Sequence, residues 1–463
     1  MRKSIKNKFN YILSAVAAIS ILAACTTDSL DPTLSQEKNS EGSITKVSNL
    51  YSLLKGAHNV LTGSGYYGRD MIATNEVRSD NVFSNGNSGR FTTQGEFAYN
   101  SNTGFMWEEA YEVIANANVI INTDLSTLEG DLAYGEHLQG GAMILRALAH
   151  YDLLRVYGQQ HAEGGNLGVP IITEFKGEDL YPSRNTIDEV KAAIYDDLET
   201  AFDMMDSSYD TSSIFVSKFV AKALEARVAV YFGDWDRAVS ASEAVIGSGM
   251  YSIIGADDFV SSWASDGGSN VIFELAYSDA DNQGSNALSY IYRYPGDAPN
   301  GYGDLQVVST VIDLFEEDDV RIDILGYQDE GARLRNIGKY PDTAVGADNI
   351  PLFRYEEVIL NYAEALLETG GDALTQLNLI TSNRGATPYV SATKENILLE
   401  RRKELMFEGF RFDDMMRTGQ DVPYWNTTET LLGTQTYPNN LFAYPIPLGE
   451  LNANSNMEPN EGY

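Results

Sequence analysis

The only cysteine in this chain of 463 residues, Cys25, limits how the fold can be stabilised. Without a second cysteine no intrachain disulfide can form, so the core must be held together by burial alone. An apolar run from Tyr11 to Ala24 leads directly into this cysteine and is too short to span a bilayer. Four basic residues precede the run: Arg2, Lys3, Lys6 and Lys8. A basic start and a short apolar stretch predict an export signal over residues 1–24.

The small residues before Cys25 follow the pattern of a bacterial lipobox, Leu22-Ala23-Ala24-Cys25. This pattern predicts cleavage before Cys25 and lipid on its thiol and its new amino group. Each buried acyl CH₂ contributes about 0.8 kcal/mol, so several chains give a stable membrane anchor. Residues 25–42 are polar and are expected to form a flexible tether between the lipid and the body. The alternative is a plain signal peptide whose cysteine is incidental.

Acidic residues outnumber basic ones by 66 to 32, which gives a formal net charge of −34. A charge of this size disfavours binding to nucleic acid and to anionic lipid surfaces, because both repel an acidic protein. We therefore expect the lipid tether, and not electrostatic attraction, to hold the protein at a membrane.

Apolar residues recur every three or four positions in several long segments, which predicts helices. The clearest stripe, over 187–205, begins with Thr186 and Glu189, which suit a capping box. Another stripe, over 355–366, ends at Gly370. We expect one large, mainly α domain over 43–463, with little β structure. Its predicted parts are helical hairpins over about 43–62, 104–250 and 352–418, loop-rich regions over about 63–103 and 251–350 with one strand at 271–277, and an extended C-terminal segment over 423–463.

One predicted hairpin, over 219–246, resembles a tetratricopeptide unit. Small residues lie at Ala226, Gly233 and Ala238, where they would let two paired helices approach closely. Asp234 and Trp235 follow in the turn. The other hairpins match this pattern less well, so we expect a few degenerate units and not a regular solenoid.

Motifs that carry catalytic or metal chemistry are missing from the sequence. The chain has no HExxH, CxxC, GxSxG or P-loop pattern, and only four histidines. The segment from Asp279 to Gly284 resembles the first half of a calcium loop, but Tyr290 stands where a bidentate Glu is needed. A turn rich in Asp and Asn explains that segment better. We therefore predict no catalytic residue, no metal ligand and no cofactor.

The charged run from Glu400 to Asp414 has two interpretations. Glu400, Glu404 and Glu408 lie one helical turn apart, with arginines at 401 and 411 among them. The run could form a binding site. Helical spacing already accounts for the charges, however, and favours a network of ion pairs that holds the last helix against the bundle.

Together with five other motifs, this run resembles the SusD/RagB family of nutrient-binding lipoproteins on the outer surface of Gram-negative bacteria. The motifs come in the family's order and span essentially the whole mature chain. They are the lipobox at Cys25; Trp107 to Asn118; Leu145-Arg146-Ala147 with Tyr157-Gly158; Arg354-Tyr355 to Ala365; Glu400 to Arg417; and Tyr444-Pro445-Ile446-Pro447 with the ending Asn460 to Tyr463.

The resemblance implies a helical body with about four tetratricopeptide-like units, decorated by loops that bind an oligosaccharide or polysaccharide. It also implies lipid anchoring in the outer membrane, facing outside, and a partner: a SusC-like TonB-dependent transporter, which imports the glycan. Some members of the family bind peptides instead. Family motifs do not identify the residues that contact the ligand, because these vary between members.

Side-chain chemistry instead indicates the candidate ligand residues, since sugars suit exposed aromatic rings flanked by amide, carboxylate or guanidinium groups. Two loops supply such residues. They are Asn81, Arg90, Phe97 and Tyr99 in the first loop, and Tyr290, Tyr292, Arg293, Tyr294 and Tyr302 in the second, with Asn286 and Asp304 nearby. The even spacing of Tyr290, Tyr292 and Tyr294 would place the three rings on one face of an extended segment. For each ring the alternative is packing against the helical body.

The sequence thus predicts a cell-surface protein that binds glycans and does not cleave them. Three alternatives stay open: a peptide-binding member of the same family, a surface-anchored all-α glycoside hydrolase, and a tetratricopeptide scaffold for a protein partner. The hydrolase needs two carboxylates roughly 5–9.5 Å apart across a cleft. The scaffold predicts a ligand in a helical groove.

Overall fold

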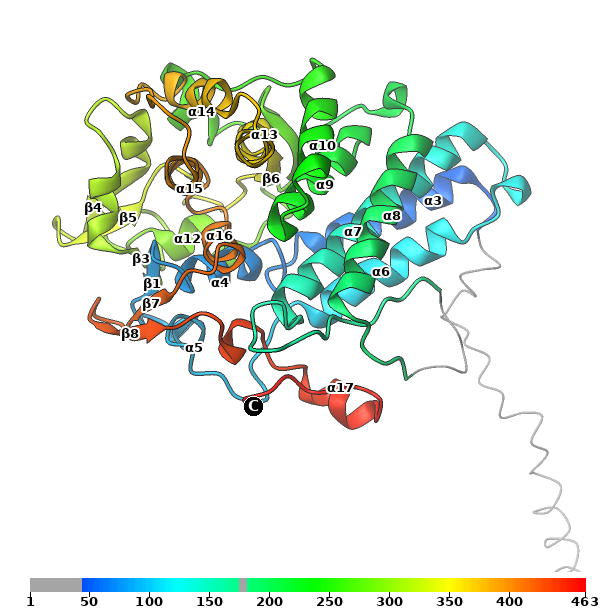
Figure 1. Cartoon of the computed structure of the whole chain (residues 1–463), viewed down its shortest axis with the longest axis horizontal. Helices are drawn as coiled ribbons and strands as arrows, with labels where there is room; N and C mark the ends of the chain where they lie inside the picture. Colours follow the sequence, from blue (N-terminus) through cyan, green and yellow to red (C-terminus); the bar gives the residue numbers. More distant parts are fainter. Residues whose placement is uncertain (1–43, 175–180) are drawn as a thin grey trace, which may run out of the picture. The chain divides into compact units, whose positions relative to one another are not determined.

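Helices dominate the part of the chain that the computed structural model describes, residues 44–174 and 181–463 (Figure 1). Residues 46–463 form one compact unit. The predicted signal over 1–24, the lipid site at Cys25 and the tether over 25–42 lie outside the described residues. Among the residues that are described, no helix has both the length and the apolar character needed to cross a bilayer.

The first helical layer is built around one long helix, α7. Its members are α3 (Val47–Leu61), α6 (Trp107–Ile121), α7 (Leu132–Tyr157) and α8 (Ile187–Met204). Helices α3, α6 and α8 all pack on α7, which is therefore buried on most of its circumference. Gly140 and Gly141 permit this close packing. A Cβ at Gly140 would clash with Met205, directly after α8, and a Cβ at Gly141 would touch Leu54 of α3.

The second layer continues from this bundle. It contains α9 (Lys218–Phe232), α10 (Trp235–Gly247), α13 (Tyr355–Thr369), α14 (Ala373–Ser382), α15 (Lys394–Glu404) and α16 (Arg411–Arg417). The hairpin predicted over 219–246 is α9 and α10, and Gly233 ends α9 with a φ of +75°. Ala238 packs against Ala229 and Ala365, so small residues do bring these helices together. The mainly α fold is confirmed; the tetratricopeptide character of the hairpins stays a prediction.

Local sequence signals act as predicted at two helix ends. The Thr186 hydroxyl accepts the Glu189 backbone N–H, and the Glu189 carboxylate accepts the Thr186 N–H at 2.8 Å, so the capping box is formed. Gly370 ends α13 in the left-handed region with a φ of +83°, which glycine adopts without steric cost. These two contacts show that the boundaries of both helices are set by local chemistry.

The two regions predicted to be loop-rich contain more regular structure than expected. They hold α4 (Asp70–Val77), β1 (Val82–Ser84), α5 (Thr92–Gly95), α11 (Phe259–Ser262), β2 (Val271–Leu275), α12 (Leu288–Tyr292), β3 (Leu305–Val307), β4 (Leu325–Gln328), β5 (Arg333–Asn336) and the start of β6 (Ile350–Arg354). Helix α4 gives no apolar stripe because its residues 71–77 are buried on all sides. The strand predicted at 271–277 is β2, and it pairs with β6.

The C-terminal segment over 423–463, predicted to be extended, combines extended strands with short helical pieces. It forms a hairpin of β7 (Val422–Trp425) and β8 (Leu431–Gln435), followed by a short helix, α17 (Leu448–Ala453). The described strands form four separate antiparallel pairs: β1 with β3, β2 with β6, β4 with β5, and β7 with β8.

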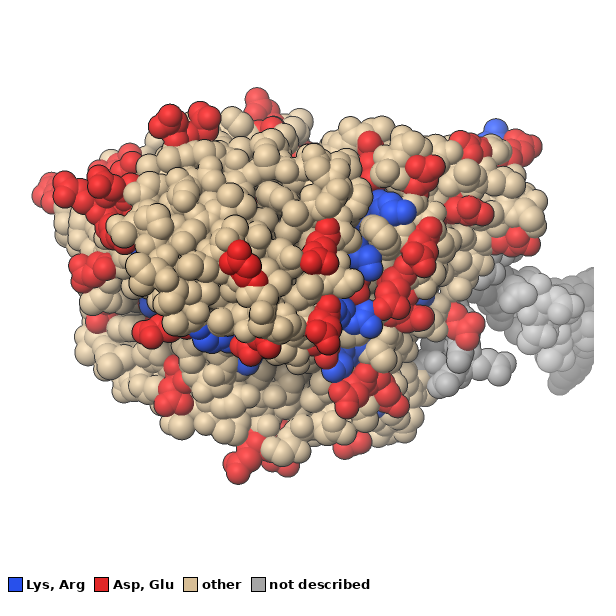
Figure 2. All heavy atoms as spheres, turned by 45° about the horizontal axis from the view of Figure 1, so that its top comes forward, with Lys and Arg blue, Asp and Glu red and all other residues tan. Residues whose placement is uncertain are grey.

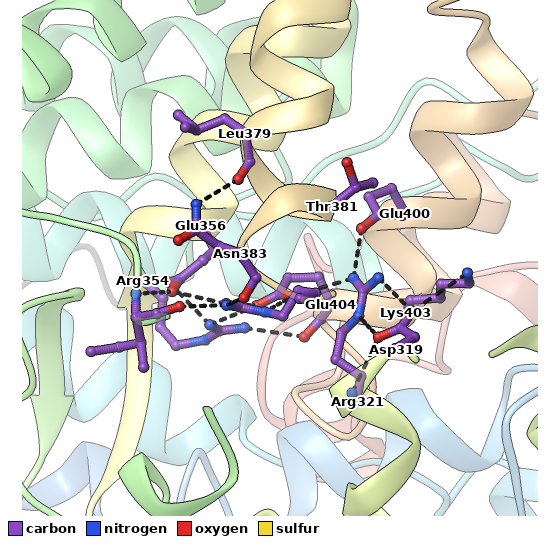
Figure 3. A network of polar contacts seen from close by, with 12 residues as sticks. Asp319, Arg321, Arg354, Glu356, Leu379, Thr381, Asn383, Glu400, Lys403 and Glu404 are labelled. Atoms are coloured by element: carbon purple, nitrogen blue, oxygen red, sulfur yellow. Dashed lines mark hydrogen bonds and ion pairs between the residues drawn. The ribbon is translucent and has the colours of Figure 1, made fainter. Parts of the chain in front are cut away.

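The charged run on α15 is part of a buried ion-pair network, as predicted (Figure 3). Glu400 pairs with Arg321 at 2.7 Å, and Glu404 pairs with Arg384 at 2.9 Å and with Arg354 at 3.2 Å. Burial alone would raise the pKa of Glu404, but Arg384 and Arg354 hold it well below its usual value. The partners come from other elements and not from neighbouring turns of α15, so the network joins the helix to β6 and to the loops around it.

Candidate functional site

The pairing of β1 with β3 brings two distant loops together. Ser84 lies opposite Leu305 in this antiparallel pair, so the segment after β1 runs beside the segment before β3. Figure 1 shows the two strands side by side at one end of the molecule. The first loop predicted from the sequence therefore meets the second, at Asn85–Arg90 and Tyr302–Asp304.

The centre of this meeting point is the ring of Tyr302, which is 40% exposed. The guanidinium carbon of Arg90 lies 4.4 Å from the ring centroid, within the range of a cation–π contact. Arg90 also donates from Nε to the Asp304 carboxylate at 2.8 Å, and the backbone N–H of Ser88 donates to the other carboxylate oxygen at 3.0 Å. Asp304 is fully buried, so this ion pair fixes the position of Arg90. The Tyr302 ring, which Arg90 contacts, stays partly open to solvent.

The backbone that carries Tyr302 is held by hydrogen bonds on both sides. The N–H of Tyr302 donates to the Tyr290 carbonyl at 2.6 Å, and the Tyr302 carbonyl accepts from Asn87 Nδ2 at 2.6 Å. The next carbonyl, that of Gly303, accepts from Asn85 Nδ2 at 2.7 Å and from Arg335 at 3.0 Å. The ring is thus preorganised, and a ligand need not order this loop on binding.

A polar rim surrounds the ring. Asn286 Oδ1 accepts a hydrogen bond from Arg90 at 3.2 Å and another from Arg69, which is itself paired with Asp70. Asn286 and Asp304 were noted from the sequence as neighbours of the second loop, and the structure places both against Arg90. Asn85, Asn87 and Arg69 were missed. For the two asparagines the signal in the sequence is the polar turn Asn85-Gly86-Asn87-Ser88-Gly89, directly before Arg90; Arg69 lies outside this turn.

Five of the nine predicted contact residues are buried, and the expectation that they are exposed is wrong. They are Asn81, Phe97, Tyr290, Tyr292 and Arg293. Residues 288–292 form helix α12, so the three tyrosines expected on one extended face do not share it. Tyr292 packs its ring 5.3 Å from that of Phe407, between centroids, inside the body.

The other buried candidates also have structural partners. Arg293 donates to the backbone carbonyls of Asn336 and Lys339, and burial lowers its pKa to about 10. Asn81 accepts from Arg402 at 2.8 Å. Phe97 belongs to an apolar cluster with Phe412 and other residues. These contacts are the packing alternative that the sequence left open for each position.

Tyr99 and Tyr294 are half-buried, and their contacts are with residues other than Tyr302. Tyr99 stacks on Tyr444 with 4.8 Å between ring centroids. Tyr294 hydrogen-bonds through its hydroxyl to Asp329, which raises the pKa of the tyrosine, and its N–H donates to Gln328 at 2.8 Å. Of the nine candidates, the structure brings only Arg90 and Tyr302 together on an accessible surface.

Two hollows lie on the first helical layer, against α3 and α7. A helical surface of this kind is where a scaffold would bind a protein partner. One of about 630 Å³ and one of about 170 Å³ share Tyr51 and Tyr134 in their walls. Tyr51 stacks on Phe215 at 5.5 Å, and Tyr134 lies 5.1 Å from Tyr209, between ring centroids. Because Tyr51 and Tyr134 each pack on a neighbouring ring, they offer a ligand less free ring surface than Tyr302 does.

Charge on the surface is mostly negative. Figure 2 shows acidic side chains spread over the visible face, and most of the Lys and Arg side chains seen there lie beside an acidic one. Within residues 44–174 and 181–463, no group of three or more His, Cys, Asp or Glu side chains is placed to hold a metal ion. The Asp279–Gly284 segment forms a turn in which Asn282 Oδ1 accepts the N–H of Gly284 at 2.9 Å.

Comparisons with known proteins agree with this architecture. A family model described as "SusD family" matches residues 336–463, and another described as "Starch-binding associating with outer membrane" matches residues 30–230. The starch-binding protein SusD of Bacteroides thetaiotaomicron is 34% identical over 128 residues, which are 27% of this chain and 22% of that protein. SusD-like protein P38 of Formosa agariphila is 27% identical over 381 residues, 68% of this chain and 72% of that protein.

The same fold is found among solved structures. The crystal structure of a SusD superfamily protein from Bacteroides vulgatus superposes with a TM-score of 0.82 at 26% identity, covering 91% of this chain and 100% of that one. The similarity in fold therefore extends over nearly all of the chain.

Proposed function

The chain belongs to the SusD/RagB family, and on this premise we propose that it binds glycan chains at the surface of the bacterial outer membrane. The observation that carries the proposal is the fixed, exposed ring of Tyr302 beside Arg90 and Asn87. A relative named a starch-binding protein supports the choice of a carbohydrate over a peptide.

The chemistry of the site suits a pyranose ring. A sugar presents a flat face of C–H groups, which packs on an aromatic face, and a rim of hydroxyls that both donate and accept hydrogen bonds. Arg90 and Arg69 place guanidinium groups at this rim; Asn87, whose Nδ2 is bonded to Tyr302, offers its amide oxygen as an acceptor, and Asn286, whose Oδ1 accepts from both arginines, offers its amide nitrogen as a donor. A few such contacts against a solvated sugar predict modest affinity, in the micromolar to millimolar range, about −4 to −8 kcal/mol.

We propose binding without bond cleavage. Glycoside hydrolysis by the usual mechanism needs two carboxyl groups facing each other across the scissile bond. At the described site the nearest carboxylate, Asp304, is fully buried and held by Arg90 and Ser88, so it cannot reach a sugar. Asp70 is engaged by Arg69. The acidic groups of the site therefore act by orienting the guanidinium groups.

The anchoring and the partner follow from the family. We propose that lipid on Cys25 tethers the body to the outer membrane with the site facing outside, and that the bound glycan is passed to a SusC-like TonB-dependent transporter. The match to a family described as associating with the outer membrane supports the location. Modest affinity suits this role, because a protein that delivers its ligand must also release it.

One experiment tests the binding and the absence of cleavage together. The body from residue 44 onward is titrated by calorimetry with a panel of oligosaccharides and with peptides, and the same incubations are examined for products. Saturable binding of one oligosaccharide series, without new reducing ends, is the expected result. Binding of peptides alone would show that the ligand is a peptide and not a glycan. Cleavage products would establish the hydrolase alternative.

A further inference from the structure

The β7–β8 hairpin lies directly beside the proposed site (Figure 1). We propose that it extends the site, so that a bound chain runs from Tyr302 past Gly86 to Trp425. This inference rests on the proposed function and adds to it a second contact region, and hence a requirement for chain length. The hairpin was not expected from the sequence, and its residues are not among the predicted contacts.

Two contacts fix the hairpin against the site. A Cβ built at Gly86 would lie 2.8 Å from Cγ2 of Thr427, so the turn of the hairpin touches the Asn85–Arg90 loop without a gap. Gly86 has no Cβ, which permits this close approach, and its φ of +72° is one that glycine adopts readily. The N–H of Ser309 donates to the Glu429 carboxylate at 2.5 Å, just after β3. Gly86 is followed by Asn87, whose amide holds Tyr302, so the two regions are continuous.

The two faces of the hairpin differ in character. Tyr424 faces the body, with its ring 6.1 Å from that of Phe97 in an edge-to-face contact. Trp425 follows Tyr424 and pairs with Leu431 across the strands. A bulge separates this pair from the pair of Tyr424 and Gly433, so Trp425 does not continue the inner face; Leu431 is 56% exposed and Trp425, opposite it, is half-buried. Leu432 is 50% exposed as well.

The outer face is apolar and carries no charge of its own. Glu429 is the only ionisable side chain between Val422 and Gln435 apart from Tyr424, and its carboxylate is engaged by Ser309. An apolar patch kept exposed beside a binding site is a sign of a second contact region. Continuity with the Tyr302 site selects the occupant, because the next sugar rings of a bound chain would present their C–H faces there.

The hairpin is rigid enough to act as a platform. Asn426 closes its turn: its N–H donates to the Thr430 carbonyl at 2.9 Å, and its Oδ1 accepts the N–H groups of Thr428 and Thr430, each at 2.9 Å. The inner face is anchored by Val422, which belongs to the apolar cluster with Phe97 and Phe412. A ligand therefore meets a preformed surface at both ends.

The test compares chain lengths. Calorimetry is carried out with the oligosaccharide series, from disaccharides to octasaccharides, of α-glucan, β-glucan, mannan, xylan and galactan. For the series that the unaltered protein binds, Trp425→Ala is expected to weaken the longer members by roughly tenfold and to leave the shortest members unchanged. Tyr302→Ala is expected to weaken all members.

Three controls keep the result interpretable. Trp425→Phe retains an aromatic face and should restore most of the affinity for long chains. Tyr181→Ala removes an exposed ring at another place and should have no effect. Melting temperatures show that each variant is folded.

The outcomes separate the two proposals. Equal affinity of Trp425→Ala and the unaltered protein at every length overturns the extension and leaves the proposed function intact; the patch would then be assigned to a protein partner. A uniform loss at all lengths also overturns it. Failure of the unaltered protein to bind any series overturns the proposed function itself.

Discussion

Arg90 and Tyr302 face each other across the junction of two loops, with the guanidinium carbon 4.4 Å from the ring centroid. The guanidinium covers one face of the ring, so the exposed area of Tyr302 belongs to its other face and its edge. Arg90 cannot easily move aside, because the buried carboxylate of Asp304 holds it. The pair therefore presents one open aromatic face in a fixed position.

Tyr292 is expected to be a core residue with no direct part in binding. Its ring is fully buried and packs on Phe407, so Tyr292→Ala should cost about 3–5 kcal/mol of unfolding free energy, as large aromatic truncations do. Urea unfolding measures this. Tyr292→Phe is the matched control: the hydroxyl has no hydrogen-bond partner in the described structure, so its removal should cost little. A stable Tyr292→Ala protein that has lost glycan affinity would contradict the assignment.

Glu404→Gln should destabilise the protein strongly. Glu404 compensates the buried guanidinium groups of Arg384 and Arg354, and removing one partner of a buried ion pair costs about 3–5 kcal/mol. The midpoint of urea unfolding should fall accordingly. Glu395→Gln, on an exposed turn of the same helix, should leave it unchanged. Similar midpoints for both variants would show that the network does not stabilise the fold.

Acid should weaken the protein through its buried histidines. His150 Nδ1–H donates to the Arg146 carbonyl and Nε2 accepts the N–H of Ile172, so the ring is neutral; burial lowers its pKa from 6.5 to about 4. Between these two values the unfolded chain binds a proton that the folded chain does not, so stability is lost as the pH falls from 6.5 to 4. His58 has the same pattern, with Leu54 and Val216 as partners.

The direction in which His150 changes the unfolding free energy with pH can be measured as a difference between two proteins. Burial raises the pKa of Glu76 to about 7, and its contribution runs in the opposite direction over 4.5–7, so the total curve mixes both effects. The unfolding free energy of His150→Gln, subtracted from that of the unaltered protein at each pH, isolates the histidine. This difference should shrink as the pH is lowered from 6.5 to 4. A constant difference would show that His150 does not titrate differently on folding.

Cys25→Ala should abolish membrane attachment without affecting the body. The predicted lipid is the anchor, because anionic membranes repel a protein with a net charge of −34. Fractionation should then find the exported variant in the soluble fraction, with unchanged glycan affinity. A variant that stays in the outer-membrane fraction after a high-salt wash would point to attachment through another protein.

Local patterns predicted the helices that have one apolar face or a distinct cap, as at Thr186 and Gly370. They failed where burial is complete. Helix α4 has no exposed face over residues 71–77, and the even spacing of Tyr290, Tyr292 and Tyr294 suits an extended segment, whereas residues 288–292 form a helix. A period of two in aromatic residues indicates a strand only when one face meets water.

The site was only half predictable for a related reason. Arg90 and Tyr302 were each chosen by residue type, but their meeting depends on the register of β1 and β3, which are far apart in the sequence. Non-local strand pairing leaves no mark on either segment alone. The β7–β8 hairpin pairs locally, but the role proposed for its outer face depends on its position beside Gly86, which is far away in the sequence.

The affinity of Tyr302→Ala for the oligosaccharide selected by the panel tests the central claim most directly. Calorimetry on the unaltered protein, Tyr302→Ala and Tyr302→Phe gives three dissociation constants under one set of conditions. Loss of the ring should weaken binding by roughly tenfold or more, whereas Tyr302→Phe keeps the aromatic face and should stay within a few-fold of the unaltered protein. Melting temperatures should be nearly equal, because the ring is exposed. An unchanged dissociation constant for Tyr302→Ala would contradict the account, since the glycan would then bind elsewhere.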